Sequence, residues 1–167
     1  SNKIKSDIDV LVSGDLSNQL TATNYAALTL GIPLIGIYSA CSTSTLGLII
    51  GSNMIEAKQA RNVITATSSH NNAAEKQFRY PVEYGGPKRK TTTFTSTGGA
   101  SALLSGEKKG IRIESATLGT VVDLGIKDVY HMGAVMAPAA AKVINDHLND
   151  TKREIGYYDL VLTGDLG

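Results

Sequence analysis

Two similar stretches lie near opposite ends of this chain, and they constrain the fold more than any other feature. Residues 9–16 read DVLVSGDL, and residues 159–166 read DLVLTGDL, 150 positions further along (residue 159 against residue 9). Each is an apolar run that ends in a small residue, Gly and Asp, which is typical of a buried strand followed by a turn. Either this common strand ending occurs twice by coincidence, or one half has been duplicated. Duplication is our hypothesis, and it predicts a chain that starts partway into one half and stops partway into the next.

The rest of the chain alternates between apolar runs and helical patterns, which predicts an α/β layer with a mostly parallel sheet. The predicted strands are residues 8–13, 34–38, 62–67, 100–105, 111–118 and 159–162. The predicted helices are residues 22–30, residues 42–59, and a helix that runs from Pro138 to about Leu148, because proline fits a first helical turn. A long polar stretch, residues 68–95, follows the third strand.

The predicted helix at residues 42–59 has apolar side chains all round, which is typical of a helix buried on all sides. Gly47 and Gly51 share one face, and each glycine lowers helix stability by about 1 kcal/mol. Either both glycines are merely tolerated, or they let another backbone approach closely. We expect close packing at the glycines, and a second helix packed against this helix in the centre of a layered protein.

Composition narrows the possible functions. A chain of 167 residues is long enough for about one domain. The content of 42% apolar and 19% charged residues argues against a disordered chain. The formal net charge of +1 argues against nucleic acid as a main partner. No apolar run reaches the ~18 residues that a membrane span needs. Cys41 is the only cysteine, so no internal disulfide can form and a reducing compartment is expected.

Cys41 follows a predicted strand and precedes the apolar helix. Unpaired N–H groups and the positive end of the helix dipole meet at a helix N-terminus, and both favour the thiolate, which is the nucleophilic form. A free cysteine is equally often a small buried hydrophobe. The position of Cys41 alone leaves both interpretations open.

The polar stretch begins where the third predicted strand ends, which is where open α/β sheets bind ligands. Arg79 can hold a carboxylate with its planar fork, and His70 and Tyr80 add further polar groups. The alternative is a solvated loop in which Arg79 pairs with Glu75, one helical turn away. No zinc-ligand spacing and no common phosphate or hydrolase motif occurs, so we expect no metal and no cofactor. His131 and His147 are isolated and receive no role.

Two motifs resemble the thiolase superfamily. Residues 39–44, SACSTS, between a strand and a glycine-containing helix, resemble its nucleophile region, and Cys41 matches its reactive cysteine. Residues 97–104, TGGASALL, resemble the glycine-rich strand late in its N-terminal half. The acid/base histidines of that superfamily lie in its second half, and His70 does not match one of them. The resemblance therefore leaves catalysis by this chain open.

Further stretches resemble, more closely, the stage V sporulation protein AD family of endospore-forming bacteria. They are ATSSHN at residues 66–71, QFRYP at 77–81, EYGG at 83–86 and MAPAA at 136–140. The resemblance implies a thiolase-like layered fold, αβαβα in the full protein, of which this chain is a truncated piece. Residues 1–110 would form most of the N-terminal half, without its first strand and helix, and residues 111–167 the start of the C-terminal half.

The resemblance also implies a function, namely binding of dipicolinic acid or its calcium chelate for uptake into the developing spore, without catalysis. The expected contacts are Cys41, Ser69, His70, Arg79 and Tyr80. The alternative is an acyltransferase with Cys41 as nucleophile, which also needs a base and an oxyanion hole.

The remaining expectations concern partners and location. Other sporulation membrane proteins are the implied partners, at the cytoplasmic face of the developing spore's inner membrane, with no transmembrane segment in this chain. A homodimer is expected, because a truncated layered fold leaves apolar surface exposed.

Overall fold

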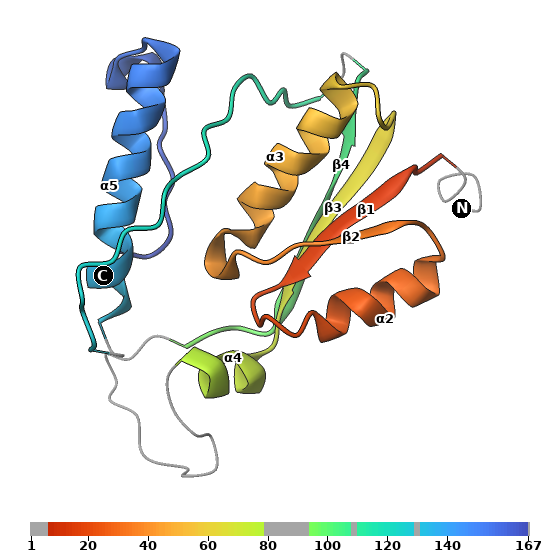
Figure 1. Ribbon diagram of the computed structural model, residues 1–167, viewed down its shortest axis with the longest axis horizontal. Coiled ribbons are helices and arrows are strands. Elements are labelled where there is room, and N and C mark those ends of the chain that lie inside the picture. Colours follow the sequence, from red (N-terminus) through yellow and green to blue (C-terminus); the bar gives the residue numbers. More distant parts are fainter. Residues whose placement is uncertain (1–6, 79–93, 108–109, 129–130, 167) are drawn as a thin grey trace. The chain divides into compact units, whose positions relative to one another are not determined.

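The structure, a computed structural model, describes residues 7–78, 94–107, 110–128 and 131–166 (Figure 1). The chain divides into two compact units, Ser1–Ile111 and Arg112–Gly167. Among the helices of these described ranges, none combines the length and the apolar character that crossing a membrane requires.

The first unit is built on a four-stranded sheet in the order β2-β1-β3-β4. Its strands are β1 (Val10–Asp15), β2 (Leu34–Gly36), β3 (Asn62–Ser69) and β4 (Gly98–Ser105). β1 pairs in parallel with both β2 and β3, whereas β4 pairs antiparallel with β3. The predicted α/β fold with a mostly parallel sheet is confirmed.

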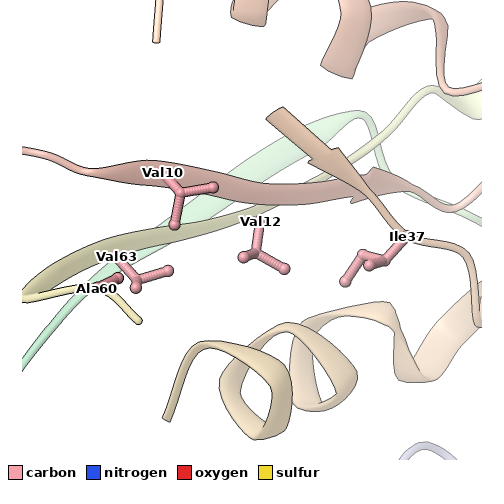
Figure 2. Close-up of a cluster of buried hydrophobic side chains, with 5 residues drawn as sticks. All are labelled: Val10, Val12, Ile37, Ala60 and Val63. Atoms are coloured by element: carbon pink, nitrogen blue, oxygen red, sulfur yellow. The ribbon is translucent and has the colours of Figure 1, made fainter. Parts of the chain in front are cut away.

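Strand β1 is buried along its whole length because helices cover both faces of the sheet. Val10 and Val12 join Ile37, Ala60 and Val63 in the apolar cluster (Figure 2), against which α3 (Thr43–Glu56) packs Leu46, Ile50 and Met54. The alternate residues of β1 face α2 (Thr21–Leu30), which contacts Ser13 and Asp15 through Thr23. Helix α2 ends at Leu30, as predicted, and Gly31 follows it with a φ of 63°, a left-handed conformation that suits glycine.

The glycines of α3 face the sheet. A Cβ added to Gly51 would lie 2.7 Å from Leu104 Cδ1 and 3.2 Å from Val63 Cγ1, and one added to Gly47 would lie 3.4 Å from Thr65 Cβ. The predicted close packing is therefore present, and it is the sheet that approaches the glycines, while a second helix packed against α3 stays a prediction. Small residues are needed here because β-branched and leucine side chains of β3 and β4 occupy the space between helix and sheet.

A short helix forms inside the polar stretch at residues 68–95, where we had predicted no helix. Helix α4 (Asn71–Phe78) buries Ala74 and Glu75. The sequence of these eight residues is NNAAEKQF, which is mostly polar. A segment this short and this polar has no apolar periodicity from which a helix could be predicted.

At the opposite end of β3, Asp9 ties β1 to the start of that strand. Its Oδ2 accepts hydrogen bonds from the N–H of Arg61 at 2.7 Å and from that of Asn62 at 3.0 Å. These two backbone hydrogen bonds lower the pKa of Asp9 below its ordinary 3.8, and the bond from Asn62 has the larger effect. The carboxylate therefore contributes its full stabilisation above that ordinary value and loses it as the pH falls through the lower value of the folded state.

We expect the Asp9→Asn variant to unfold at a lower urea concentration than the parent chain at neutral pH, because an amide oxygen is a weaker acceptor than a carboxylate. The difference in urea midpoint should shrink below pH ~4 and vanish once both chains carry a neutral group. Urea titrations followed by circular dichroism across this pH range measure it. A midpoint difference that stays constant down to pH ~2 would contradict this account.

The second unit is built on α5 (Met132–Thr151), followed by a short 3₁₀ turn at Ile155–Tyr157. Pro138 lies inside α5 and not at its first turn, so that part of the prediction is wrong. The helix begins earlier because the side chain of His131 caps it, accepting from the Ala134 N–H. Pro138 therefore cannot donate a helical hydrogen bond to the Ala134 carbonyl, and its ring crowds that carbonyl.

The strands predicted at residues 111–118 and 159–162 are absent from the structure. Both stretches are largely exposed, with Ile111, Leu160 and Leu162 among the exposed apolar side chains. A strand needs a neighbour for its backbone hydrogen bonds, and the described part of the second unit contains none. The two similar stretches therefore lie in unlike surroundings, since residues 9–16 contain the central strand β1. The duplication and the division into thiolase-like halves stay predictions.

Candidate functional site

A cleft of about 360 Å³ lies at the carboxyl ends of β1 and β3, beside the start of α3. Its lining combines a thiol, hydroxyls and small residues, among them Cys41, Ser44, Thr67, Ser69, Gly98 and Ala100. Ligand sites in open α/β folds favour this edge of the sheet, because loops and helix N-termini meet there. The cleft is the candidate site of the first unit.

The register between β3 and β4 hollows out the cleft. Thr67 pairs with Ala100, and Ser69 pairs with Gly98, so each hydroxyl residue on β3 lies opposite a residue with little or no side chain. Cross-strand partners share a face of the sheet, and here it is the face covered by α3. Small residues on β4 thus leave space above the hydroxyls of β3.

Cys41 lies on a tight turn between β2 and α3, inside the 3₁₀ segment Ala40–Ser42. Ala40 has a φ of 45°, a left-handed conformation that is uncommon for alanine and is often found at functional sites. Thr43 holds this turn, because its hydroxyl donates to the Ala40 carbonyl at 2.7 Å and accepts from the Ser39 N–H at 3.1 Å. The cysteine is exposed, and it lines the cleft.

Ser69 and Asn71 bind residues 95–97 to the end of β3. The Ser69 hydroxyl donates to the Ser96 carbonyl at 2.6 Å, which leaves the Ser69 oxygen able to accept a further hydrogen bond. The Asn71 side chain donates to the Thr95 carbonyl at 2.6 Å, and its N–H donates to Thr97 Oγ1 at 3.0 Å. This wall of the cleft is therefore built from paired backbone and side-chain groups.

The lining of the cleft carries no charged side chain among the described residues. The nearby buried carboxylate, Asp15, lies on the α2 side of the sheet, where it accepts from the hydroxyls of Thr23 at 2.9 Å and Ser68 at 2.8 Å. Within the described ranges no three His, Cys, Asp or Glu side chains gather in a way that could hold a metal ion. What the cleft offers a ligand is hydroxyl groups, a thiol and the N-terminal end of α3.

The structure brings two of the predicted site residues together, Cys41 and Ser69, which both line the cleft. His70 is exposed and lies beside the cleft, outside its lining. Arg79 and Tyr80 lie outside the described residues, as does the alternative pairing of Arg79 with Glu75.

Sequence reasoning missed Ser44 and Thr67, together with the small residues of β4 opposite them. Thr67, Ser68 and Ser69 form a run of hydroxyl residues at a strand end, and this run was the available indication. Only the register with β4 shows which of the three face α3.

Comparison with solved structures defines the class of fold. The structure of PksG, an HMG-CoA synthase from Bacillus subtilis, is similar with a TM-score of 0.57 and 15% sequence identity. The match covers 90% of this chain and 39% of the PksG chain. The structure of AbyA1, a tetronic acid condensing enzyme, is similar with a TM-score of 0.55 and 16% identity, over 89% of this chain and 53% of the AbyA1 chain. A 3-oxoacyl-(acyl-carrier-protein) synthase III gives a TM-score of 0.55 over 92% of this chain and 56% of its own at 15% identity. The chain thus has a thiolase-like fold, and identities this low show the fold alone.

Comparison of sequences gives the family. Residues 1–167 match the family described as stage V sporulation protein AD (SpoVAD). Stage V sporulation protein AD of Bacillus subtilis (strain 168) is 48% identical over 166 residues, which cover 99% of this chain and 49% of that protein. This chain therefore belongs to the stage V sporulation protein AD family, as its motifs predicted. It spans about half the length of the curated relative that it matches.

Proposed function

We propose that this chain carries part of a non-catalytic pocket that binds dipicolinic acid, alone or as its calcium chelate, for uptake into the developing spore. The observation that carries the proposal is the cleft at Cys41, where hydroxyl groups meet the N-terminal end of α3. Hydroxyls and helix N-termini both favour carboxylates. The lining supplies no cation of its own among the described residues, so the proposal assigns that part to Arg79, with His70 and Tyr80 beside it.

Calorimetric titration of the full-length protein with dipicolinate, with and without calcium, tests this proposal. We expect Arg79→Ala to weaken binding at least about tenfold, because a charge-assisted bond to a carboxylate is lost. Lys88→Ala is the matched control, since it removes one cation from the basic run KRK at residues 88–90 and should leave the affinity unchanged. An Arg79→Ala variant that binds as tightly as the parent would remove Arg79 from the account.

Thr67→Val tests the cleft itself, because it keeps the shape of the side chain and removes the hydroxyl. A loss of about three- to tenfold in affinity is expected for one hydrogen bond. Thr45→Val, on an exposed position of α3 outside the cleft lining, is the control.

A second candidate function is acyl transfer through Cys41. The exposed, free Cys41 and the left-handed Ala40 beside it favour this candidate. Against it, the described lining holds no histidine, lysine or carboxylate that could act as the base.

Intact mass spectrometry after incubation of the full-length protein with acyl-coenzyme A separates the two functions. We expect no acyl adduct on the parent protein, and we expect Cys41→Ala to keep its affinity for dipicolinate within about threefold. An adduct that disappears in Cys41→Ala would establish the acyltransferase instead.

The proposed partners are other membrane proteins of the same uptake system, at the cytoplasmic face of the spore's inner membrane, and a second copy of this chain. Exposed apolar side chains such as Leu103 on β4 support association with a second copy. Strand β4 also contains no charged residue, and an uncharged edge strand can pair with another chain. Light scattering at high concentration tests the homodimer, and a clean monomer would count against it.

A further inference from the structure

Helix α3 packs closely on the sheet along most of its length, and the cleft opens where this packing stops. A Cβ on Gly51 would lie 2.7 Å from Leu104 Cδ1, and one on Gly47, a turn earlier, would lie 3.4 Å from Thr65 Cβ. Leu104 thus fills the space between α3 and β4 at the level of Gly51. One further turn towards the start of the helix comes Thr43, which lines the cleft.

The residues of β4 explain why the cleft opens at this level. Every second residue of β4 shares the face that α3 covers, and these side chains become smaller towards the cleft. They are Leu104, Ala102, Ala100 and Gly98. A Cβ added to Gly98 would have no atom of the described chain within 4 Å apart from its own neighbours in sequence, so it would project into open space. The cleft is therefore the part of the interface between α3 and the sheet that β4 leaves unfilled.

The size and the floor of the cleft limit the ligands that it can take. Pockets for small molecules measure about 300–1,000 Å³, and this cleft, at about 360 Å³, is near the lower end of that range. Such a volume suits a single ring with its substituents. Where a strand has no Cβ, the flat face of a ring can lie directly on the peptide backbone. The backbone at Gly98 therefore favours a planar ring over a puckered one, which needs more room above the strand.

Hydroxyl groups beside this floor are available to the polar groups of a ligand. The hydroxyls of Thr43, Ser68 and Ser69 already bond to protein groups. Within the described ranges, the hydroxyls of Ser44, on the first turn of α3, and of Thr67, on β3, make no hydrogen bond to another residue, and both residues line the cleft. Each can donate one hydrogen bond to a carboxylate oxygen or to a ring nitrogen.

We propose that Gly98 and Ala100 are specificity-determining residues of the cleft, because they keep open a gap into which one planar ring fits. The ring of a single-ring dicarboxylate then lies on the backbone of β4, and its polar edge faces the hydroxyls of Ser44 and Thr67. This inference rests on the proposed function, since it concerns the same cleft and takes dipicolinate as the ligand. It adds that the cleft selects its ligand by the thickness of the ring as well as by charge.

Ala100→Leu tests the gap, because it places in the cleft the residue type that fills the same interface at Leu104. We expect calorimetry of the full-length variant to show dipicolinate binding weakened at least about tenfold, the size expected when added methylene groups occupy a pocket. Ser101→Leu is the matched control. Ser101 is the next residue of β4, is exposed, and pairs with Ala66 on the opposite face of the sheet, so this substitution should leave the affinity unchanged.

Gly98→Ala is a second variant that keeps the proposal testable if leucine at position 100 disturbs the strand, which circular dichroism would detect. Its added Cβ enters open space, so we expect the variant to fold as the parent does. The same Cβ lies where the ring would rest, so we expect dipicolinate to bind about threefold or more weakly.

A matched pair of ligands tests the selection by shape. Isophthalate and cis-cyclohexane-1,3-dicarboxylate carry the same two carboxylates, and only isophthalate has a planar ring. In competition with dipicolinate on the full-length parent, we expect isophthalate to bind at least about tenfold more tightly than the cyclohexane compound. Gly98→Ala should reduce this ratio about threefold, whereas a general loosening of the fold would weaken both ligands alike and leave their ratio unchanged.

The outcomes separate this inference from the function on which it rests. If the parent does not bind dipicolinate, the proposed function fails and the inference fails with it. If the parent binds dipicolinate but a folded Ala100→Leu binds it as tightly, only the inference fails. Equal competition by the two ring compounds, or competition by neither, would also overturn the inference and leave the proposed function standing.

Discussion

Gly14→Ala should lower the free energy of unfolding of the first unit by about 3 kcal/mol or more, which is most of the stability of an ordinary small domain. The reason is close approach and not backbone conformation. A Cβ at this position of β1 would overlap the Ile37 carbonyl oxygen and lie 2.7 Å from Thr43 Cγ2. Neither neighbour can move easily, because Ile37 donates through its N–H to the Ser13 carbonyl at 2.9 Å and Thr43 holds the turn of Cys41.

Urea unfolding followed by far-ultraviolet circular dichroism measures this loss. Gly164→Ala is a matched control, because Gly164 is the counterpart of Gly14 in the second similar stretch. There a Cβ would meet only the end of the flexible Met136 side chain, at 3.9 Å, so we expect a change of less than about 0.5 kcal/mol. If the two substitutions lowered the free energy of unfolding equally, the close packing around Gly14 would not be the reason that this position requires glycine.

The second large effect is expected for Asp15→Ala, with a loss of about 2–4 kcal/mol in the free energy of unfolding. Asp15 is 6% exposed and accepts from the N–H of Thr23 at 3.2 Å as well as from the Thr23 and Ser68 hydroxyls. Ser13 Oγ lies 3.1 Å from Thr23 Oγ1 and extends this network to β1. Alanine would leave three buried or half-buried donors without their acceptor and would detach α2 from the sheet.

Asp15→Asn distinguishes the geometry from the charge. The amide keeps one oxygen acceptor, so Asn should recover part of the stability that Ala loses. Asp165→Ala, at the exposed counterpart position, is the control and should cost less than about 1 kcal/mol. If Asp15→Ala were as mild as Asp165→Ala, the network around Thr23 would not hold α2 in place.

Predictions from sequence succeeded where burial follows from the local pattern. The runs that became β1 and β3 are apolar enough to be recognised as buried parallel strands, and Gly31 marks the end of α2 by its left-handed conformation. Cys41 and Ser69 both line the cleft for a related reason. Both follow a predicted strand, and the carboxyl ends of parallel strands meet at one edge of the sheet.

Predictions failed where a residue's state depends on partners far away in the chain. An apolar run such as residues 159–162 can form a strand, but it becomes one only beside another strand. Thr67 and Ser68 are neighbours in sequence and both line the cleft, yet β-strand alternation directs the hydroxyl of Ser68 away to Asp15. His147 looked isolated because its partners lie 30 positions before it and 11 after it.

The amino-acid sequence alone thus determined the alternation of strands and helices, the parallel character of the sheet, the family motifs and the position of the thiol at a helix start. These depend on periodicity and on neighbouring residues, which are visible along one dimension. The tertiary structure alone decided which hydroxyls line the cleft, what occupies the space at Gly14 and Gly51, and how the histidines support α5. Those features arise from strand register and from contacts between distant residues, which have no local pattern because the same residue types are compatible with several partners.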